Sequence, residues 1–311
     1  MTPAVVVPPA APPRISPSLR SLSLLAIIAL LGCGGGASRG TGPDTTRTTT
    51  PPPAITWTQV WSDEFDGPAG TPVDDTRWTF DIGDGCAAGI CGWGNNEKEF
   101  YTNSVENASL DGQGNLAIVA RPAVLDVSCY YGPCRYSSAR ITTRGKLAAG
   151  PGRVEARIKL PVGQGLWPAF WMLGNDFGTV GWPASGELDV MENRGSAPRI
   201  SSSAVHGPGY SGATPFHHEN TIGSGTLADA FHVYTVEWNA TLVRFSVDGT
   251  AHYAVGRADL QQYGPSILDK PYFIILNLAV GGNFDGDPAT DAILPATMLV
   301  DYVRVYTPSS P

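Results

Sequence analysis

Three carboxylates stand within six residues near the middle of this 311-residue chain. They are Glu187, Asp189 and Glu192, in the segment from Gly186 to Asn193. Acidic groups packed together repel one another, so at least one pKa rises and at least one carboxyl group keeps its proton. A protonated carboxyl group beside an ionised one can supply a general acid and a nucleophile. The cluster is therefore a candidate catalytic site.

A β-strand with one irregularity is needed to bring the three acids together. On a helix, at about 100° per residue, they spread over different faces. In a strand, Glu187 and Asp189 share a face, but regular alternation turns Glu192 inward. We therefore predict a β-bulge at residues 190–191, which returns Glu192 to the wet face. About four strand steps then separate the outer two acids, roughly 13 Å between Cα atoms. On a concave sheet their carboxyl groups converge to about 5–6 Å, near the spacing of retaining glycosidases.

Tryptophans surround this acidic segment in the sequence. Acids alternating with apolar residues usually mark the solvated face of a strand, which is the alternative interpretation. However, Trp167, Trp171 and Trp182 lie close by, and large aromatic rings are costly to leave without a partner. Trp167 and Trp171 are four residues apart, so in a strand they face the same way. Rings that stack on sugars beside acids that cleave glycosidic bonds predict a carbohydrate site, and core packing of the two rings is the alternative.

Six segments, in order, resemble glycoside hydrolase family 16, in its laminarinase-like (endo-β-1,3-glucanase) branch. The segment 187–192 is similar to that family's Glu-x-Asp-x-x-Glu strand, and the similarity extends over about residues 57–308. The other five segments are residues 61–67, 93–102, 153–161, 165–173 and 300–306.

The resemblance implies an all-β fold, a β-jelly-roll sandwich of the concanavalin A-like kind, with a substrate cleft on its concave face. It also implies hydrolysis with retention of configuration and no cofactor for catalysis. Glu187 is then the nucleophile, Glu192 the general acid/base, and Asp189 a neighbour hydrogen-bonded to Glu187. A structural calcium ion is also expected, with Asp301 and the region around Glu64 as ligands, since calcium prefers oxygen.

The expected substrate-binding residues surround the acids. Asn96 and Arg140 match cleft positions of the family, and His206 and Trp182 are expected at its border. For Asn96 a simple turn, for Arg140 a surface charge and for His206 a hydrogen-bonded bystander are the alternatives. The full set is Asn96, Arg140, Trp167, Trp171, Trp182 and His206.

The first functional hypothesis is an endo-acting hydrolase of β-1,3-glucan, with mixed β-1,3/1,4 linkages as a further substrate. The alternatives are a family 16 hydrolase of agarose or carrageenan, a transglycosylase, and a non-catalytic carbohydrate-binding jelly roll. The last alternative fits poorly because all three acids are present.

Residues 1–33 are predicted to be a lipoprotein-type signal peptide. Two arginines precede an apolar run at 22–31 that is too short to span a bilayer. The run ends at residues 30–33 in Leu-Leu-Gly-Cys, so we expect lipid on Cys33, with an ordinary signal peptide as the alternative. Residues 34–56, rich in Gly, Ser, Thr and Pro, are predicted to be a tether. These features predict an exported protein, either held at a bacterial outer membrane or cell surface or secreted.

Residues 57–311 are predicted to form one catalytic domain, expected to be monomeric. The chain has 20 basic and 28 acidic residues. Removing the four arginines and one aspartate of residues 1–56 leaves 16 and 27, a net charge of −11. This charge repels nucleic acid and suits a neutral polysaccharide such as a β-glucan.

Four cysteines remain beyond residue 33, and an even number in an exported chain predicts two disulfides. Their spacing favours the local pairs Cys86–Cys91 and Cys129–Cys134. Cross-pairing is the open alternative, and a zinc site is disfavoured because no histidine lies nearby. Period-two alternation and turn residues predict strands along most of the domain. The predicted strands are residues 115–120, 153–160, 233–238, 243–247, 272–278 and 299–306, and a short helix is expected at 258–263.

Overall fold

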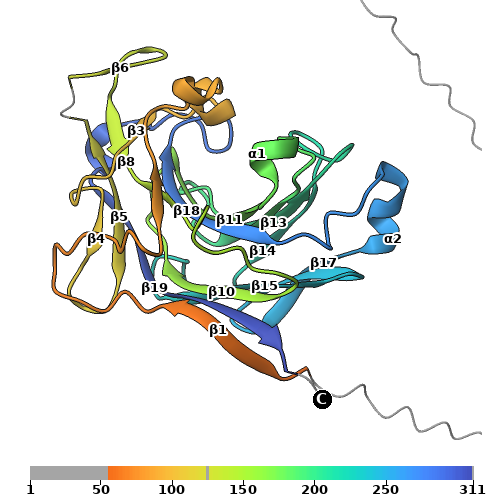
Figure 1. Ribbon diagram of the computed structural model, residues 1–311. Helices are drawn as coiled ribbons and strands as arrows, with labels where there is room; N and C mark the ends of the chain where they lie inside the picture. Colours follow the sequence, from red (N-terminus) through yellow and green to blue (C-terminus); the bar gives the residue numbers. More distant parts are fainter. Residues whose placement is uncertain (1–54, 124–125, 310–311) are drawn as a thin grey trace, which may run out of the picture. The chain divides into compact units, whose positions relative to one another are not determined.

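Two large β-sheets packed face to face form the framework of the described part of the chain (Figure 1). The structure is a computed structural model that describes residues 55–123 and 126–309. The predicted signal peptide with Cys33, and residues 34–54 of the predicted tether, lie outside the described residues. Within the described part, no helix is long and apolar enough to cross a membrane.

The larger sheet has ten strands, and its pairings are antiparallel except between β3 and β8. Along the sheet they are β17 (Thr250–Gly256), β16 (Leu242–Val247), β15 (His232–Asn239), β10 (Gly152–Lys159), β19 (Ala296–Pro308), β5 (Leu116–Pro122), β8 (Tyr136–Ser138) and β3 (Glu99–Tyr101). In addition, β1 (Trp57–Asp63) pairs with β19, and β4 (Ala108–Leu110) pairs with β5.

The second sheet has seven antiparallel strands. Their order is β14 (Phe216–Thr221), β13 (Ile200–His206), β12 (Glu187–Glu192), β11 (Leu166–Gly174), β18 (Tyr272–Val280), β9 (Arg140–Thr142) and β2 (Thr79–Asp81). The remaining elements are short: α1 (Phe177–Val180), α2 (Arg257–Leu260), the 3-10 helices η1 (Cys86–Ala88), η2 (Cys91–Gly94), η3 (Gln261–Tyr263) and η4 (Asp291–Ile293), and the β6 (Ser128–Cys129)–β7 (Gly132–Pro133) hairpin.

Alternating apolar residues from both sheets fill one continuous core. From β10, Val154, Ala156 and Ile158 are fully buried, and from β11, Phe170 and Met172 meet them. Strand β18 is buried along its whole length, which explains its almost unbroken apolar run. The predicted β-sandwich is confirmed, as are the strands read from period-two alternation. The helix expected at 258–263 is divided between α2 and η3.

Two disulfides staple loops next to η2 and β6. The predicted local pairs, Cys86–Cys91 and Cys129–Cys134, are both confirmed. The carboxylate of Asp84 joins the two loops, because it accepts hydrogen bonds from the backbone N–H of Cys86 (3.1 Å) and of Tyr130 (2.7 Å). The stapled loops therefore act as one unit beside the end of the seven-stranded sheet.

Candidate active site

Strand β12 carries one extra residue relative to both of its neighbours. On β11, Met191 lies opposite Phe170 and Asp189 opposite Trp171, so the residue between them has no partner. On β13, the three steps from Asp189 to Glu192 match only two steps. The predicted β-bulge is confirmed: Val190 and Met191 both enter the core. The three acids consequently share the face of the seven-stranded sheet turned away from the core, which we call the outer face.

Each acid has its own polar neighbour on the outer face, and for the two outer acids that neighbour is a hydrogen-bond donor. The indole N–H of Trp182 donates to Oε2 of Glu187 over 2.6 Å, and that of Trp167 donates to Oε1 of Glu192 over 3.0 Å. Nε2 of His206 lies 3.1 Å from Oδ2 of Asp189. His206 is positioned by register, because β13 places it directly opposite Glu187. Neutral donors thus hold the two outer acids, and they orient a carboxylate without neutralising it.

Burial raises the pKa of all three carboxyl groups. Burial first, and the charge of Asp189 second, raise the pKa of Glu187 to about 8. Burial first, and the charge of Glu187 second, raise the pKa of Glu192 to about 7. The pKa of Asp189 lies well above its usual range, because of burial and then the charge of Glu192. The cluster therefore holds at least one proton at neutral pH, as acid/base chemistry requires.

Oxygen and nitrogen atoms of Glu187, Asp189 and His206 lie within 4.8 Å of one another. Among residues 55–123 and 126–309, this is the one group of three or more acidic, histidine or cysteine side chains spaced closely enough to share a cation. An ion there would occupy the face on which the acids meet substrate. Catalysis without a cofactor stays a prediction.

The three tryptophans lie around the acids. Trp167 and Trp171 share the outer face as predicted, and the Trp167 ring packs against Phe284 with centroids 4.8 Å apart. One face of Trp171 is covered by the guanidinium of Arg140, 4.7 Å from the ring centroid. Trp182 is 46% exposed, so its ring is open to a ligand. Stacking of these rings on sugar stays a prediction.

Arg140 is held in place rather than free on the surface. Its Nε lies 3.0 Å from Oδ2 of Asp81, and its guanidinium lies between the rings of Trp93 and Trp171, 4.7 Å from each centroid. One row of paired residues runs across the sheet from Asp81 through Arg140, Asn277 and Ala169 to Glu192. Arg140 therefore belongs to the same row as the predicted acid/base, and its contact with glucan stays a prediction.

Asn96 lies in the loop after η2, at the surface. Its φ of 60° is left-handed, a conformation that asparagine tolerates well. Its side-chain amide donates to Oδ1 of Asn283 over 2.9 Å, so it ties this loop to the loop after β18. Asn96 thus has a structural contact, and substrate binding by it stays a prediction.

Two polar residues of this region, Asn277 and Tyr101, were missed as site residues by the sequence reasoning, which named their neighbour Glu97 as resembling a cleft residue. Asn277 accepts from the indole N–H of Trp171 (2.7 Å) and donates to the hydroxyl of Tyr101 (3.1 Å). That hydroxyl in turn donates to Glu97 (3.3 Å). One signal was available: Asn277 is the single side-chain amide in the nine buried residues of β18, which are otherwise apolar or aromatic, and a buried polar group needs a partner.

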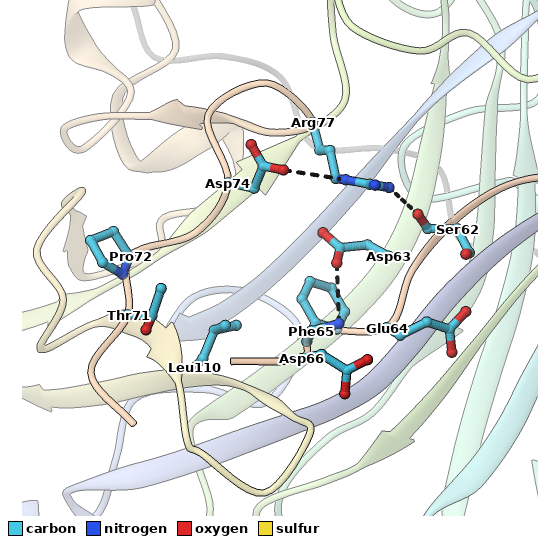
Figure 2. A pocket seen from close by; sticks show the side chains of 10 residues that line it. All are labelled: Ser62, Asp63, Glu64, Phe65, Asp66, Thr71, Pro72, Asp74, Arg77 and Leu110. Carbon is cyan, nitrogen blue, oxygen red and sulfur yellow. Dashed lines mark hydrogen bonds and ion pairs between the residues drawn. The ribbon is translucent and has the colours of Figure 1, made fainter. Parts of the chain in front are cut away.

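The two carboxylates expected to bind calcium are each paired with a separate arginine. Glu64 receives two hydrogen bonds from Arg304, at 3.0 and 2.7 Å, and Asp301 forms an ion pair with Arg157. Glu64 also borders a pocket on the N-terminal side of the domain (Figure 2). Carboxylates already neutralised by guanidinium groups fit a divalent cation poorly. Calcium binding stays a prediction, and no step below uses it.

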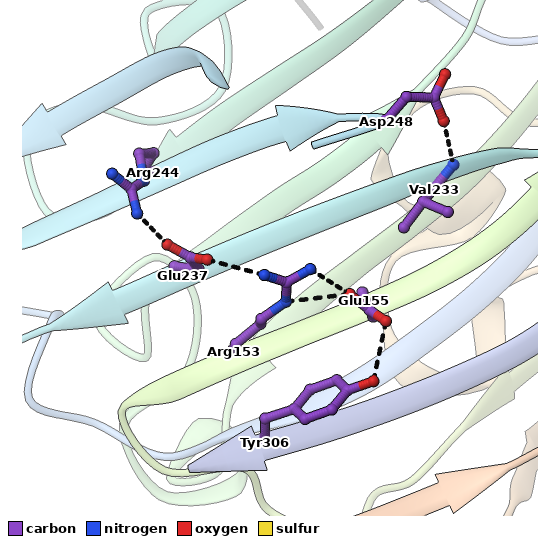
Figure 3. A network of polar contacts seen from close by, with 7 residues as sticks. All are labelled: Arg153, Glu155, Val233, Glu237, Arg244, Asp248 and Tyr306. Carbon is purple, nitrogen blue, oxygen red and sulfur yellow. Dashed lines mark hydrogen bonds and ion pairs between the residues drawn. The ribbon is translucent and has the colours of Figure 1, made fainter. Parts of the chain in front are cut away.

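One group of acids on the ten-stranded sheet is neutralised by arginine, in contrast to the three acids of β12. On the ten-stranded sheet, Arg153 lies between Glu155 (2.6 Å) and Glu237 (3.2 Å), and Arg244 pairs with Glu237 from the other side (Figure 3). The hydroxyl of Tyr306 donates to Glu155 over 3.0 Å. Within this network the positive and negative side chains of four strands neutralise one another, so we interpret the network as structural.

A family model described as glycosyl hydrolases family 16 matches residues 94–304. The chain belongs to glycosyl hydrolase family 16. This membership confirms the resemblance seen in the sequence and makes the chain a glycoside hydrolase.

Relatives within family 16 cover most of the chain. It is 39% identical over 267 residues to the glucan endo-1,3-beta-glucosidase A1 of Niallia circulans and 38% identical over 260 residues to the beta-glucanase of Rhodothermus marinus. The first match covers 79% of this chain and 37% of the Niallia circulans protein. The second covers 80% of this chain and 85% of the Rhodothermus marinus protein. The crystal structure of the endo-beta-1,3-glucanase from Pyrococcus furiosus is 43% identical, with a TM-score of 0.77 over 83% of this chain and 97% of that one.

Proposed function

We propose that this family 16 hydrolase cleaves internal β-1,3 linkages of glucan by double displacement, with retention of configuration. The observation that carries the proposal is the bulged strand β12, which presents Glu187, Asp189 and Glu192 on one face. Indole N–H groups donate to the two outer acids, and the imidazole of His206 lies beside Asp189. The names of the Niallia circulans and Pyrococcus furiosus relatives support the β-1,3 linkage.

In the first step, Glu187 attacks the anomeric carbon as a carboxylate while Glu192 gives its proton to the glycosidic oxygen. The bond between that carbon and oxygen breaks, and a covalent glycosyl-enzyme forms. Asp189 assists by holding the proton that its raised pKa retains, because an uncharged Asp189 no longer opposes ionisation of Glu187. The hydrogen bond from Trp182 stabilises the same carboxylate.

In the second step, Glu192 acts as the base. Glu187 has lost its charge in the ester, and that charge is the second cause of the raised pKa of Glu192. Glu192 therefore becomes a stable carboxylate that removes a proton from water. The water oxygen attacks the anomeric carbon, Glu187 leaves as a carboxylate, and the original configuration is restored.

The test is release of reducing sugar from laminarin by the full-length protein. Glu187→Gln and Glu192→Gln each lower kcat by at least ~10³-fold, because each removes a group that acts on the reacting bond. Glu106→Gln is the matched control, since Glu106 is an exposed partner of Arg121, and it keeps wild-type activity. Undiminished activity in either active-site variant rejects the assignment.

A panel of polysaccharides separates the alternative substrates. Mixed β-1,3/1,4-glucan is included because relatives named endo-1,3-1,4-beta-glycanases, EglC and ExsH of Rhizobium meliloti, are 31% and 33% identical. Agarose and carrageenan test the galactan alternative, and cleavage of galactans alone overturns the glucan proposal. Product analysis at high acceptor concentration distinguishes hydrolysis from transglycosylation. Binding of laminarin without any cleavage would make the protein a carbohydrate-binding jelly roll.

We also propose export and anchoring through lipid on Cys33. The two disulfides support export, because disulfides persist in oxidising compartments. Expression in a bacterium, followed by membrane fractionation and labelling with a radioactive fatty acid, tests the anchor. Cys33→Ser abolishes labelling and releases the protein to the soluble fraction if the proposal holds. A monomeric state is likewise proposed, with light scattering as its test.

A further inference from the structure

A second pair of carboxyl groups lies buried near the outer face, beyond the three acids of β12. Glu97 and Glu99 are only 5% and 0% exposed, and their carboxyl groups lie close enough to each other to share a proton. Neither forms an ion pair with any lysine or arginine of the described residues; the nearest guanidinium, of Arg140, is bound to Asp81. Two carboxyl groups this close together cannot both be ionised without a large cost, so one of them holds a proton.

The surrounding contacts decide which carboxyl group is protonated. Glu97 accepts two hydrogen bonds, from the amide of Asn95 (3.0 Å) and the hydroxyl of Tyr101 (3.3 Å). Glu99 accepts one at Oε2, from the backbone N–H of Val280 (2.7 Å), and its buried Oε1 has no hydrogen-bond partner among the described residues. A proton on Glu99 that is donated to Glu97 satisfies both groups. Glu99 is then the neutral partner, and the single negative charge is carried by Glu97.

Two hydrogen bonds and two steps of strand register separate this charge from the predicted acid/base. The hydroxyl of Tyr101 links Glu97 to Asn277. Asn277 lies opposite Ala169, which lies opposite Glu192. Because Ala169 contributes only a methyl group, no larger side chain of β11 stands in this row between Asn277 and Glu192. The two acid pairs therefore border the same part of the outer face.

We propose that Glu97 and Glu99 form a proton-sharing pair whose negative charge, held at Glu97, acts on Glu192 from across the sheet. Glu97 is thus a positioning residue for the reaction, and Glu99 serves as its permanent proton donor. The inference rests on the function proposed above. A negative charge near Glu192 favours its protonated form, which is the form that the first step consumes. Consistently, the charge of Glu97 is among the causes that raise the pKa of Glu192.

The other charged and titratable groups around the two sites are few. Arg140 from β9, Tyr101 from β3 and Tyr131 face the buried pair. Glu187 and Asp189 from β12 and His206 from β13 face Glu192. Each of these groups stays in place in the variants below, so a change in pH dependence reports the charge at Glu97.

The test compares the pH profiles of kcat/KM for laminarin in Glu97→Gln and Glu99→Gln, using the full-length protein. Glu97→Gln removes the charge, so Glu192 loses its proton more easily and the alkaline limb moves down by about half a pH unit. Glu99→Gln keeps a donor to Glu97 and an acceptor for Val280, so its alkaline limb stays at the wild-type pH. Glu106→Gln is again the matched control. An unmoved limb in Glu97→Gln, or an equal shift in both variants, overturns the proposal.

A measurement that does not depend on activity keeps the proposal testable if a variant fails to fold or no glucan is cleaved. In wild-type protein labelled with ¹³C at glutamate carboxyl groups, one resonance beyond those of Glu187 and Glu192 stays at the protonated chemical shift at pH 8. The resonances of Glu187 and Glu192 are identified by their loss in Glu187→Gln and Glu192→Gln. If all other glutamates are ionised at that pH, the proton-sharing pair does not exist. Failure of the proposed function instead shows as a wild-type protein inactive on every polysaccharide, with this resonance unaffected.

Discussion

At the scale of single residues, the fold treats its acids in two ways. Glu155 and Glu237 of the ten-stranded sheet are paired with arginines, so their charges are cancelled where they stand. Glu187 and Glu192 receive neutral indole donors instead. An indole N–H orients a carboxylate and leaves its charge and its proton available. The choice of partner, more than the presence of an acid, distinguishes the candidate catalytic groups from structural ones.

The proton on Glu192 sets the upper pH limit of activity. The neighbouring carboxyl group of Glu187 titrates in the same range, with a pKa of about 8, so the last proton of the pair is lost between about pH 7 and 8. As a general acid Glu192 must hold that proton, and with its pKa raised to about 7, kcat/KM for laminarin falls as the pH rises through this range. The Trp167 N–H lowers this pKa by stabilising the ionised form. Trp167→Phe therefore moves the alkaline limb to higher pH, measured from initial rates between pH 4 and 10. A limb that stays in place or moves down contradicts the role given to this hydrogen bond.

The indole of Trp182 donates to Glu187, the proposed nucleophile, rather than to Glu192, the proposed acid. Trp182→Phe keeps an aromatic ring and removes the donor to Oε2 of Glu187. A hydrogen bond to a charged group contributes about 1.5 kcal/mol, so kcat falls about 10-fold. Steady-state kinetics on laminarin measure the change. Trp61→Phe serves as the control, because Trp61 packs against Trp78 and Arg77 and touches none of the three acids. Equal losses in both variants would point to general destabilisation.

At the scale of elements, the β-bulge of β12 decides which way Glu192 points. The bulge sends two consecutive residues, Val190 and Met191, into the core and so restores the outward direction at the next position. The stapled loops beside the sheet are a second such element. They hold η2, whose Trp93 covers one face of the Arg140 guanidinium. Local irregularities therefore point these side chains toward the outer face, a direction that a regular strand would not give them.

An insertion and a deletion in β12 test the bulge. Inserting one alanine between Met191 and Glu192 turns Glu192 toward the core, which abolishes laminarin hydrolysis and lowers the melting temperature because a carboxyl group is buried. Deleting Val190 makes the strand regular and leaves Glu192 on the outer face. That variant keeps measurable activity, at a stability loss of about 1–2 kcal/mol for the lost core side chain. Comparable activity in both variants contradicts the assignment.

The two disulfides close loops of equal length, so the chain-entropy cost of losing either is about 2 kcal/mol. Thermal unfolding of Cys86→Ser/Cys91→Ser and Cys129→Ser/Cys134→Ser measures this cost. Only the first pair lies in the loop that carries Trp93. We therefore expect lower laminarin hydrolysis from the first variant at temperatures where both variants remain folded. Equal activity in the two double variants would show that the position of Trp93 does not depend on the Cys86–Cys91 disulfide.

At the scale of the whole molecule, the packing of the sandwich core stabilises the fold against the unfavourable desolvation of the three clustered acids. Core residues of β10, β15 and β19 pack against those of β11, β12 and β18 in one continuous cluster. Burying three neighbouring carboxyl groups opposes folding, since each prefers water when ionised. The large shared core offsets that cost, and the cost itself depends on pH.

The part of the stability that depends on Glu187 should fall as the pH rises through the acidic and neutral range. The pKa of Glu187 is about 8 in the folded protein and about 4.5 when unfolded. Between these values the unfolded chain binds fewer protons at this site, so rising pH favours unfolding, up to a limit of about 5 kcal/mol. Glu187→Gln removes this term. Its melting temperature should equal that of wild type near pH 4 and exceed it near pH 9. A difference that does not grow with pH contradicts the raised pKa.

The amino-acid sequence by itself determined the sandwich, the catalytic strand and the two staples. Period-two alternation predicts which side chains of a strand enter the core. The same alternation places Glu192 on the face of Glu187 only if one extra residue precedes it, which predicts the bulge. Cysteines five residues apart reach each other through their own loop. These features depend on residues close together in the chain, where spacing alone fixes geometry.

Only the tertiary structure decided which partners hold the acids. The row from Asp81 to Glu192 and the contact of Tyr101 with Asn277 join strands more than 100 residues apart. The burial of Glu97 beside Glu99, and the arginine partners of Glu64 and Asp301, likewise follow from how distant strands pair. Register between distant strands is set by the packing of the whole core, and no local pattern encodes it. The acids can thus be identified in the sequence, whereas the tertiary structure determines which of them are protonated and which residues contact them.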